Sequence, residues 1–313
     1  MSFSSDVKHE ITTASLTDEE TRAQLSSFIH LNSTMHIYKN NIEVHSEISN
    51  PTIARRIFSL LKDRYEVDVQ LTILKQQTFD KNHVYRLRIK DKAMVILEDL
   101  GIYSSEGLRK IPYNVIVVKE NLARSYLAGC FLASGSVNSP IKPDYHLEIG
   151  ANTDEMAQFI VSLMERFGLS AKVTQRRNKP IVYLKAADQI ADFLKVVGAY
   201  NMMMEFEDIR IQRDFRNSLT RLDNCEVANE MKTIKAGNAQ LDAIYTLIEH
   251  NRYNHMDNRL IEVADLRMDN PEASLNELIE IYYHETGTKI SKSGLQHRFN
   301  RIIELAQKLE EGD

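Results

Sequence analysis

The sequence predicts an α+β domain made of two copies of one unit, followed by a small all-α domain. Two observations support this prediction: the first two thirds of the chain repeat themselves, and the remainder is helical and polar from Arg210 onward. A displacement of 102 residues (127 − 25) places Leu25 on Leu127 and brings Leu71 opposite Val173, with small length changes in between. Most superposed positions are apolar in both copies, so we expect two similar units with equivalent buried faces.

The first copy is expected to contain three helices and four strands. Thr17 and Glu20 have the spacing of a capping box, in which a hydroxyl and a carboxylate bond the free N–H groups of a helix start. Asn50 and Pro51 favour a second helix start, because Asn caps helices well and Pro fits the first helical position. The expected elements are helix 17–34, strands 35–39 and 41–48, helix 51–65, strands 67–75 and 83–90, and helix 92–100 before Gly101.

The second copy repeats this order. Its expected elements are helix 121–133, strand 145–151, helix 154–167, strands 171–175 and 181–185, and helix 188–197. The copies span about residues 17–101 and 120–198, and the unit in each is αββαββα. Two such units would build one pseudo-twofold domain over residues 1–209.

The last third of the chain is expected to be a linker and a small helical domain. Residues 210–239 are rich in Asn, Arg and Lys, and they predict a helical linker with Gly237 as a break. Residues 240–313 contain four segments with helical apolar spacing, at 240–250, 258–268, 274–283 and 291–310.

The last two of these helices have the pattern of a helix-turn-helix. Ser274 and Glu277 form a second capping box, and the helix that they open ends near Gly287. A longer helix starts at Ser291, and one stripe of it is expected to face the core: Leu295, Phe299, Ile302, Ala306 and Leu309. In a helix-turn-helix the second helix enters the major groove of DNA.

The polar side of that second helix carries the predicted DNA contacts. Four Lys or Arg and no Asp or Glu occur from Lys289 to Arg301, although the chain has a net charge of −5. Arg and Lys suit guanine edges and phosphates, Gln and Asn can pair with adenine, and a helix start offers N–H groups to phosphate. The residues expected to bind DNA are Ser274, Lys289, Ser291, Lys292, Ser293, Gln296, His297, Arg298, Asn300 and Arg301. A helical bundle with a solvated polar face is the alternative interpretation.

Composition excludes several other classes of protein. The 313 residues are 43% hydrophobic and 27% charged, which is ordinary for a soluble globular protein. Cys130 and Cys225 are far apart, the histidines lack metal-ligand spacing, and no P-loop, GxGxxG or GxSxG motif occurs. No apolar run approaches the roughly 18 residues of a membrane span. We therefore expect a cytoplasmic protein with no metal, cofactor, membrane contact or small-molecule substrate.

A short motif in each copy resembles the LAGLIDADG helix of homing endonucleases. Residues 127–135 are Leu-Ala-Gly-Cys-Phe-Leu-Ala-Ser-Gly, and residues 25–33 occupy the equivalent place in the first copy. The resemblance implies two helices packed at the pseudo-twofold axis, each with a metal-binding acid before its last motif residue. Asn32 and Ser134 stand at those positions, and hard divalent cations need carboxylate oxygens, so we expect no metal site and no catalytic residue. Small residues suited to a close helix crossing remain: Ser26, Ser27, Ala128 and Gly129.

The whole chain resembles one bacterial family, the WhiA proteins, in which a degenerate two-motif LAGLIDADG domain precedes a helix-turn-helix. Residues 222–229 and 290–298 carry the resemblance most clearly. It implies a non-enzymatic transcription regulator, of sporulation in filamentous actinobacteria and affecting cell division and chromosome segregation in low-GC Gram-positive bacteria. The implied partners are double-stranded DNA and other regulatory or division proteins, and the implied location is the nucleoid. The fold also implies a concave DNA face on its strands, with secondary contacts from Arg86, Arg88, Arg176 and Arg177.

Two other functions remain open from the sequence. A metal-dependent endonuclease could use Glu43 and Glu148, which lie at roughly equivalent places in the two copies, in place of the motif acids. A scaffold whose helical tail binds protein would need neither DNA nor metal. DNA cleavage and salt-sensitive DNA binding separate the three interpretations.

Overall fold

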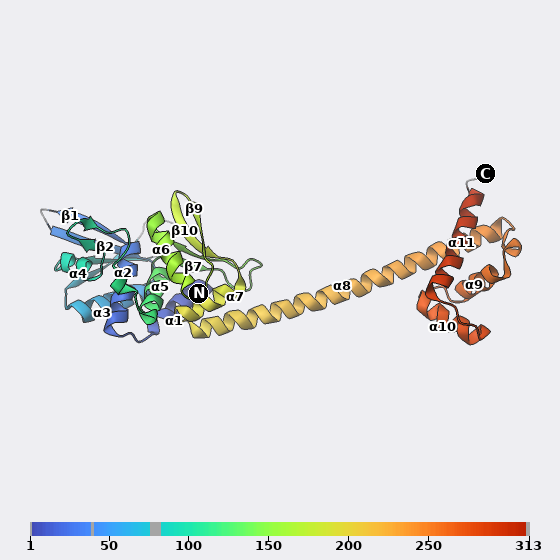
Figure 1. Ribbon diagram of the computed structural model, residues 1–313, viewed down its shortest axis with the longest axis horizontal. Coiled ribbons are helices and arrows are strands. Elements are labelled where there is room, and N and C mark those ends of the chain that lie inside the picture. Colours follow the sequence, from blue (N-terminus) through green and yellow to red (C-terminus); the bar gives the residue numbers. More distant parts are fainter. Residues whose placement is uncertain (1, 39–40, 76–82, 311–313) are drawn as a thin grey trace. The chain divides into compact units, whose positions relative to one another are not determined.

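The chain folds into two compact units, Met1–Arg213 and Asp214–Asp313, in a computed structural model that describes residues 2–38, 41–75 and 83–310 (Figure 1). The predicted end of the first strand at residue 39 lies outside the described residues. No helix within these described ranges is both long and apolar enough to cross a membrane.

The first copy forms a four-stranded antiparallel sheet with helices packed on one face. Its elements are α2 (Asp18–Asn32), β1 (Ser33–Tyr38), β2 (Asn41–Ile48), α3 (Pro51–Tyr65), β3 (Val69–Lys75), β4 (His83–Ile89) and α4 (Ala93–Asp99). The strands are ordered β1-β2-β4-β3, and the register sets Val44 opposite Ile89, both buried. The capping box of Thr17 and Glu20 opens α2, and Asn50 caps α3, as the sequence predicts.

The second copy repeats this fold with the equivalent strand order, β7-β8-β10-β9. Its elements are α5 (Glu120–Ser134), β7 (Gly135–Val137), β8 (Leu147–Gly150), α6 (Asp154–Glu165), β9 (Lys172–Arg176), β10 (Lys179–Leu184) and α7 (Ala187–Val196). The sequence pattern did not locate β7, because three residues are too few to display a period of two. Between the copies lie a hairpin of β5 (Tyr103–Ser104) and β6 (Gly107–Leu108) and the 3₁₀ turn η1 (Asn114–Ile116). The predicted two-copy α+β architecture is confirmed.

The two motif helices, α2 and α5, cross closely in the core of the first unit. A Cβ placed on Gly129 would lie 2.0 Å from the Ser27 Oγ and 2.4 Å from the Gln24 carbonyl oxygen. Atoms in a packed core do not approach so closely, so the small motif residues are what allows the two backbones to meet. Ser125 adds a bond across the pair, because its Oγ donates to the Glu20 carbonyl oxygen at 2.7 Å. The predicted packing role of these small residues is confirmed.

A further helix, α1 (Phe3–Thr13), precedes the first copy and was not expected from the sequence. It buries one side chain per turn, namely Phe3, Val7 and Ile11. The Phe3 ring lies 6.0 Å from the Phe206 ring of the long helix α8 (Tyr200–Glu249). The Glu10 carboxylate accepts from two backbone N–H groups at the start of α8, at 2.8 and 2.9 Å. These contacts hold the first turns of α8 against α1 in the first unit.

The predicted linker is part of α8, which is one continuous helix, so the prediction of a break at Gly237 is wrong. Glycine in a helix interior costs roughly 1 kcal/mol relative to alanine. Here it provides space, since a Cβ on Gly237 would lie 3.3 Å from the Pro271 carbonyl oxygen and 3.7 Å from a guanidinium nitrogen of Arg267. The sequence shows the glycine, but not the loop that packs on it. The helix expected at 240–250 is the end of α8.

The second unit forms a small helical core around the end of α8. Its other helices are η2 (Tyr253–His255), α9 (Asn258–Asp269), α10 (Leu275–Thr286) and α11 (Lys292–Glu310). The predicted capping box of Ser274 and Glu277 opens α10, and Gly287 follows it with φ +70°, a left-handed conformation that glycine adopts at little cost. The core takes a side chain from each long helix, including Ile244, Val263, Leu278 and Phe299.

Candidate nucleic-acid interface

α11 turns its polar side to solvent because its apolar side forms the centre of the second unit. Leu295, Phe299 and Ile302 are fully buried, where α11 packs on α9 and α10. Most of the residues predicted to bind DNA are exposed around the start and middle of this helix: Lys289, Ser291, Lys292, Ser293, His297, Asn300 and Arg301. The sequence therefore located both sides of α11 correctly, since a 3.6-residue period separates them.

The start of α11 is open to an anion. The Ser291 Oγ accepts from the Gly294 N–H at 3.1 Å and caps the helix. The first turn contains no acidic residue, so the partial positive charge of the helix start is not neutralised from within. Lys292 and Ser293 are exposed in this turn, beside backbone N–H groups that can bind a phosphate.

Ser274, in contrast, is occupied with holding the start of α10. Its hydroxyl accepts from the Glu277 N–H at 3.3 Å, and its own N–H donates to the Glu277 carboxylate at 2.7 Å. These bonds hold the pKa of Glu277 below its usual range. A charged Glu277 satisfies this helix start, which leaves the start of α11 as the better place for phosphate.

The middle of α11 presents an amide pair and an arginine. Gln296 donates from its amide to the Asn300 Oδ1 at 2.9 Å, one helical turn away. Paired amides of this kind are suited to the edge of a base. Arg301 forms an exposed ion pair with Glu304 at 2.9 Å, which another hydrogen-bond acceptor would replace at little cost because exposed pairs are weak.

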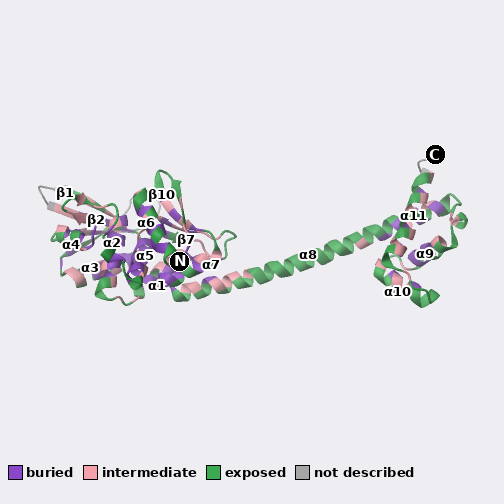
Figure 2. Ribbon diagram, in the orientation of Figure 1, coloured by how far each residue is buried: buried purple, intermediate pink, exposed green. Residues whose placement is uncertain are grey.

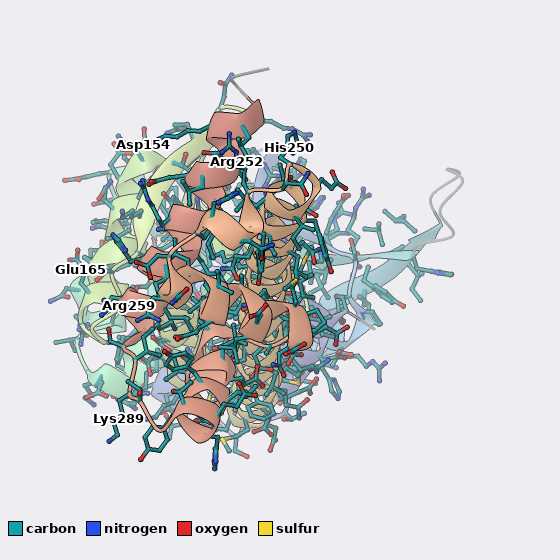
Figure 3. All side chains as sticks on the ribbon, turned by 90° about the vertical axis from the view of Figure 1, so that its right-hand side faces the viewer. Asp154, Glu165, His250, Arg252, Arg259 and Lys289 are labelled. Atoms are coloured by element: carbon teal, nitrogen blue, oxygen red, sulfur yellow. The ribbon has the colours of Figure 1, made fainter. Side chains whose placement is uncertain are left out.

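Arg298 and Lys289 are held by other parts of the second unit. The Arg298 guanidinium donates to the carbonyl oxygen of Arg259 at 3.4 Å and lies 5.9 Å from the Tyr282 ring. It thus helps to hold α11 against α9 and α10. The Lys289 Nζ lies 5.7 Å from the Tyr283 ring in the turn before α11, and Figure 3 labels Lys289 and Arg259 at the surface of this unit.

A hollow beside the start of α11 brings in residues that the sequence did not single out. Its volume is about 280 Å³, and its lining includes Lys232 of α8, Asn276 of α10 and Lys292 of α11. Arg267 also lines it, is only 2% exposed, and donates to the Gln240 Oε1 at 2.9 Å and to three backbone carbonyl oxygens. All four of these acceptors are neutral oxygens, and within the described ranges no carboxylate pairs with the guanidinium, so its charge adds to the positive potential of the hollow. The sequence feature that could have indicated this hollow is Arg267, an arginine on the apolar side of α9.

The positions of the motif acids in the first unit hold neutral side chains at the ends of α2 and α5. Ser134 donates from its Oγ to the Gly150 carbonyl oxygen at 2.6 Å. The Asn32 Oδ1 is buried without a hydrogen-bond partner among the described residues, and Asn32 borders a cavity of about 320 Å³ that Lys8 also lines. Burial lowers the pKa of Lys8 to about 8. An amide, a hydroxyl and an amine do not fit Mg²⁺, and the described residues contain no cluster of three His, Cys, Asp or Glu suited to a metal ion.

The first sheet holds its two arginines in ion pairs on the face away from the helices. Arg86 pairs with Glu47 and Arg88 with Glu43, each at 2.6 Å. The hydrogen bonds from Arg88 hold the pKa of Glu43 below its usual range. The two arginines do share one face, as their spacing predicts, but each is already neutralised by a carboxylate of the neighbouring strand.

The second sheet has an equivalent arrangement with more positive charge. Arg176 pairs with Glu148 at 3.2 Å, and His146 contacts the same carboxylate at 3.1 Å. By strand alternation, Lys172 and Lys179 lie on the same face as Arg176. Arg177 is exposed in the turn that follows β9. Glu43 and Glu148 are thus both ion-pair partners of arginines.

Three family models match the chain in order along its length. The WhiA N-terminal LAGLIDADG-like domain matches residues 18–103, the WhiA LAGLIDADG-like domain matches residues 123–216, and the WhiA C-terminal HTH domain matches residues 219–306. They define a class of protein in which two LAGLIDADG-like repeats precede a helix-turn-helix.

Individual proteins show the same relationship over the full chain. The chain is 39% identical over 313 residues to the probable cell division protein WhiA of Staphylococcus saprophyticus, covering 100% of this chain and 99% of that protein. The protein of that name from Latilactobacillus sakei is 42% identical over 308 residues, covering 98% and 97%. The crystal structure of full-length WhiA from Thermatoga maritima matches with a TM-score of 0.61 at 22% identity, covering 98% of this chain and 99% of that one. The chain belongs to the WhiA family.

Proposed function

We propose that this chain is a DNA-binding regulator that does not cut DNA, with residues 240–313 as its DNA-binding domain and α11 as its recognition helix. The observation that carries the proposal is the polar side of α11 from Lys289 to Arg301, which presents basic and amide side chains and no carboxylate. Basic groups that neutralise phosphates supply most of the affinity for duplex DNA, and side chains that reach base edges supply the sequence preference.

The contacts divide between these two tasks. Lys292 and Ser293, beside the free N–H groups of the helix start, are suited to a backbone phosphate. Gln296, Asn300 and Arg301, further along the same side, are suited to base edges in the major groove. His297 lies between the two sets.

The names of the relatives support a role in cell division. Both the Staphylococcus saprophyticus and the Latilactobacillus sakei proteins are named as probable cell division proteins. For this chain we propose regulation of transcription in cell division and chromosome segregation, with sporulation as the equivalent role in sporulating relatives. Such a protein would associate with the nucleoid and could bind other regulatory or division proteins.

The lost motif acids support the absence of nuclease activity. Asn32 and Ser134 offer no charge to a divalent cation, and the alternative carboxylates of Glu43 and Glu148 are bound to arginines. Incubation of the full chain with plasmid and Mg²⁺ or Mn²⁺ should leave the plasmid intact. Cleavage that disappears on Glu43→Gln and Glu148→Gln would show instead that the protein is an endonuclease.

Mobility shifts of the full chain on duplex DNA test the role of α11. Lys292→Ala should weaken binding on all sequences and reduce the slope of log affinity against log salt by about 1. Lys308→Ala is the matched control, because Lys308 is an exposed lysine of the same helix about 24 Å away at 1.5 Å per residue. Equal effects of the two substitutions, or binding that does not depend on salt, would favour a protein-binding tail.

A further inference from the structure

The middle of α8 lies in neither hydrophobic core. Every residue from 214 to 232 is exposed, and Figure 2 shows this part of the helix in the colour of exposed residues. Phe206 is buried in the core of the first unit, while Gln240 and Ile244 are buried near the other end. At 1.5 Å per residue the exposed stretch is about 28 Å long.

The composition of this stretch is unlike that of a simple helical spacer. Helices that act only as spacers are rich in Ala, Glu and Lys, which favour the helix and keep it in water. Residues 214–232 instead contain three asparagines and several β-branched or hydroxyl side chains. An isolated helix of this length and composition is marginal in water, so a bound partner would stabilise it.

Between residues 217 and 235 of α8, the basic and the acidic side chains lie on opposite sides of the helix. Residues at steps of three or four from 217 to 235 form one side, which we call the basic face: Asn217, Arg221, Asn224, Ala228, Lys232 and Lys235. The three acids of the same segment, Asp223, Glu226 and Glu230, follow their own helical spacing on the opposite side. The basic face therefore contains cations and amides without a carboxylate.

The side chains of the basic face have no intramolecular partners among the described residues. Within residues 2–38, 41–75 and 83–310, none of its amide and basic groups forms a hydrogen bond or an ion pair. The two preceding arginines differ: Arg210 pairs with Asp188, and Arg213 donates to the carbonyl oxygens of Pro140 and Lys142. Arginines near the first unit are thus used for packing, whereas Arg221 and the lysines beyond it remain available.

The basic face is continuous with the start of α11. Lys232 and Lys292 line the same hollow of about 280 Å³, and the buried Arg267 lines it too. Three cations, Lys232, Arg267 and Lys292, line this hollow and no carboxylate does, whereas Glu230, Glu272 and Glu277 line the adjoining hollow. An anionic polymer bound at Lys292 would therefore have Lys232 of α8 beside it.

We propose that the basic face of α8 is a second DNA-binding surface, which contacts the duplex beside the site of α11. Arg221, Lys232 and Lys235 would bind phosphates, and Asn217 and Asn224 would reach base edges or sugar oxygens. A bare helix fits the major groove, which is about 12 Å wide. From Asn217 to Lys235 the face is about 27 Å long, so it would extend the contact by about 8 base pairs. The inference rests on the proposed DNA-binding function.

Two arginines on opposite sides of α8 provide the test of this proposal. Arg221 lies on the basic face, while Arg216 lies on the acidic side, and both are exposed. Binding of the full chain to a labelled 40-base-pair duplex of random sequence would be measured by fluorescence anisotropy over a range of KCl concentrations. Arg221→Ala should weaken binding about tenfold more than Arg216→Ala and lower the salt slope by about 1.

Each outcome distinguishes this inference from the proposed function. If Lys292→Ala weakens binding but Arg221→Ala and Arg216→Ala have equal effects, α11 binds DNA and the inference is overturned. If Arg221→Ala weakens binding and Lys292→Ala does not, α8 binds DNA and the assignment of α11 fails. Hydroxyl-radical footprints add a second measurement: residues 217 to 224 span about 10 Å, so the triple variant with alanine at Asn217, Arg221 and Asn224 should protect about 3 fewer base pairs than the unmodified chain.

Discussion

Replacement of Gly129 by alanine tests the close crossing of α2 and α5, on which the first unit is built. The added Cβ would lie 2.0 Å from the Ser27 Oγ and 2.4 Å from the Gln24 carbonyl oxygen. Favourable contacts are roughly 3.5–4.0 Å, so the helices would have to separate by about 1 Å. Rotation of Ser27 relieves one contact, but the carbonyl oxygen of Gln24 belongs to the backbone of α2 and cannot turn away.

The size of the effect follows from two opposing contributions. Alanine gains about 1 kcal/mol in helix propensity over glycine, whereas overpacking a core costs about 1–3 kcal/mol and sometimes more. Because two contacts are violated and one is rigid, we expect a net loss of about 2 kcal/mol. For a unit of this size that corresponds to a fall of about 4–8 °C in the midpoint of thermal unfolding.

Circular dichroism melts of the full chain, with hydrogen exchange of α2 and α5, measure this change. The double variant Gly129→Ala with Ser27→Ala should recover only part of the loss, because the contact with the Gln24 carbonyl remains. A midpoint for Gly129→Ala equal to or above that of the unmodified chain would refute the close crossing.

Three further predictions concern buried charge. Burial lowers the pKa of Lys8 from 10.5 to about 8, so the unfolded chain binds more protons between those values and stability rises with pH there. Lys8→Met should therefore raise the free energy of unfolding at pH 7 by about 3 kcal/mol, and this gain should disappear near pH 10.5. Burial lowers the pKa of His30 from 6.5 to about 4, so between these values the unfolded chain binds more protons and the free energy of unfolding falls as pH falls. His30→Gln should therefore reduce the loss of stability between pH 6.5 and 4. Arg267→Met removes the donors to Gln240 and three carbonyl oxygens and should destabilise the second unit by about 3 kcal/mol, whereas the exposed Arg259→Met should have little effect, as denaturant melts can measure.

The sequence predicts the starts and ends of helices correctly where the prediction depends only on neighbouring residues. The capping boxes at Thr17 and Ser274 open helices as predicted, because a hydroxyl and a carboxylate at that spacing satisfy the free N–H groups of a helix start. The left-handed Gly287 ends α10 for an equally local reason. The internal repeat predicts the two-copy architecture correctly, because equivalent apolar positions bury equivalent faces.

The signals failed where a residue depends on a neighbour distant in sequence. Gly237 predicts a helix break, yet α8 continues through it and the missing side chain makes room for the loop at Pro271. The DNA contact of Arg298 stays a prediction, but its spacing does not show that its guanidinium also donates to the Arg259 carbonyl oxygen and lies near the Tyr282 ring. α1 was missed because its short apolar stripe, without the helix that covers it, is indistinguishable from a polar terminus.

The sequence alone determined the two-copy fold, the loss of both motif acids and the two sides of α11, because each depends on residue type and spacing along one segment. Only the tertiary structure decided which charges are available to a partner. Arg86 and Arg88 are neutralised by Glu47 and Glu43 of the adjacent strand, whereas Arg221 and Lys232 have no such neighbour in the part of the chain that the structure describes. The physical reason is that the field of a charge depends on what lies within a few ångströms of it, and residues far apart in sequence supply those neighbours.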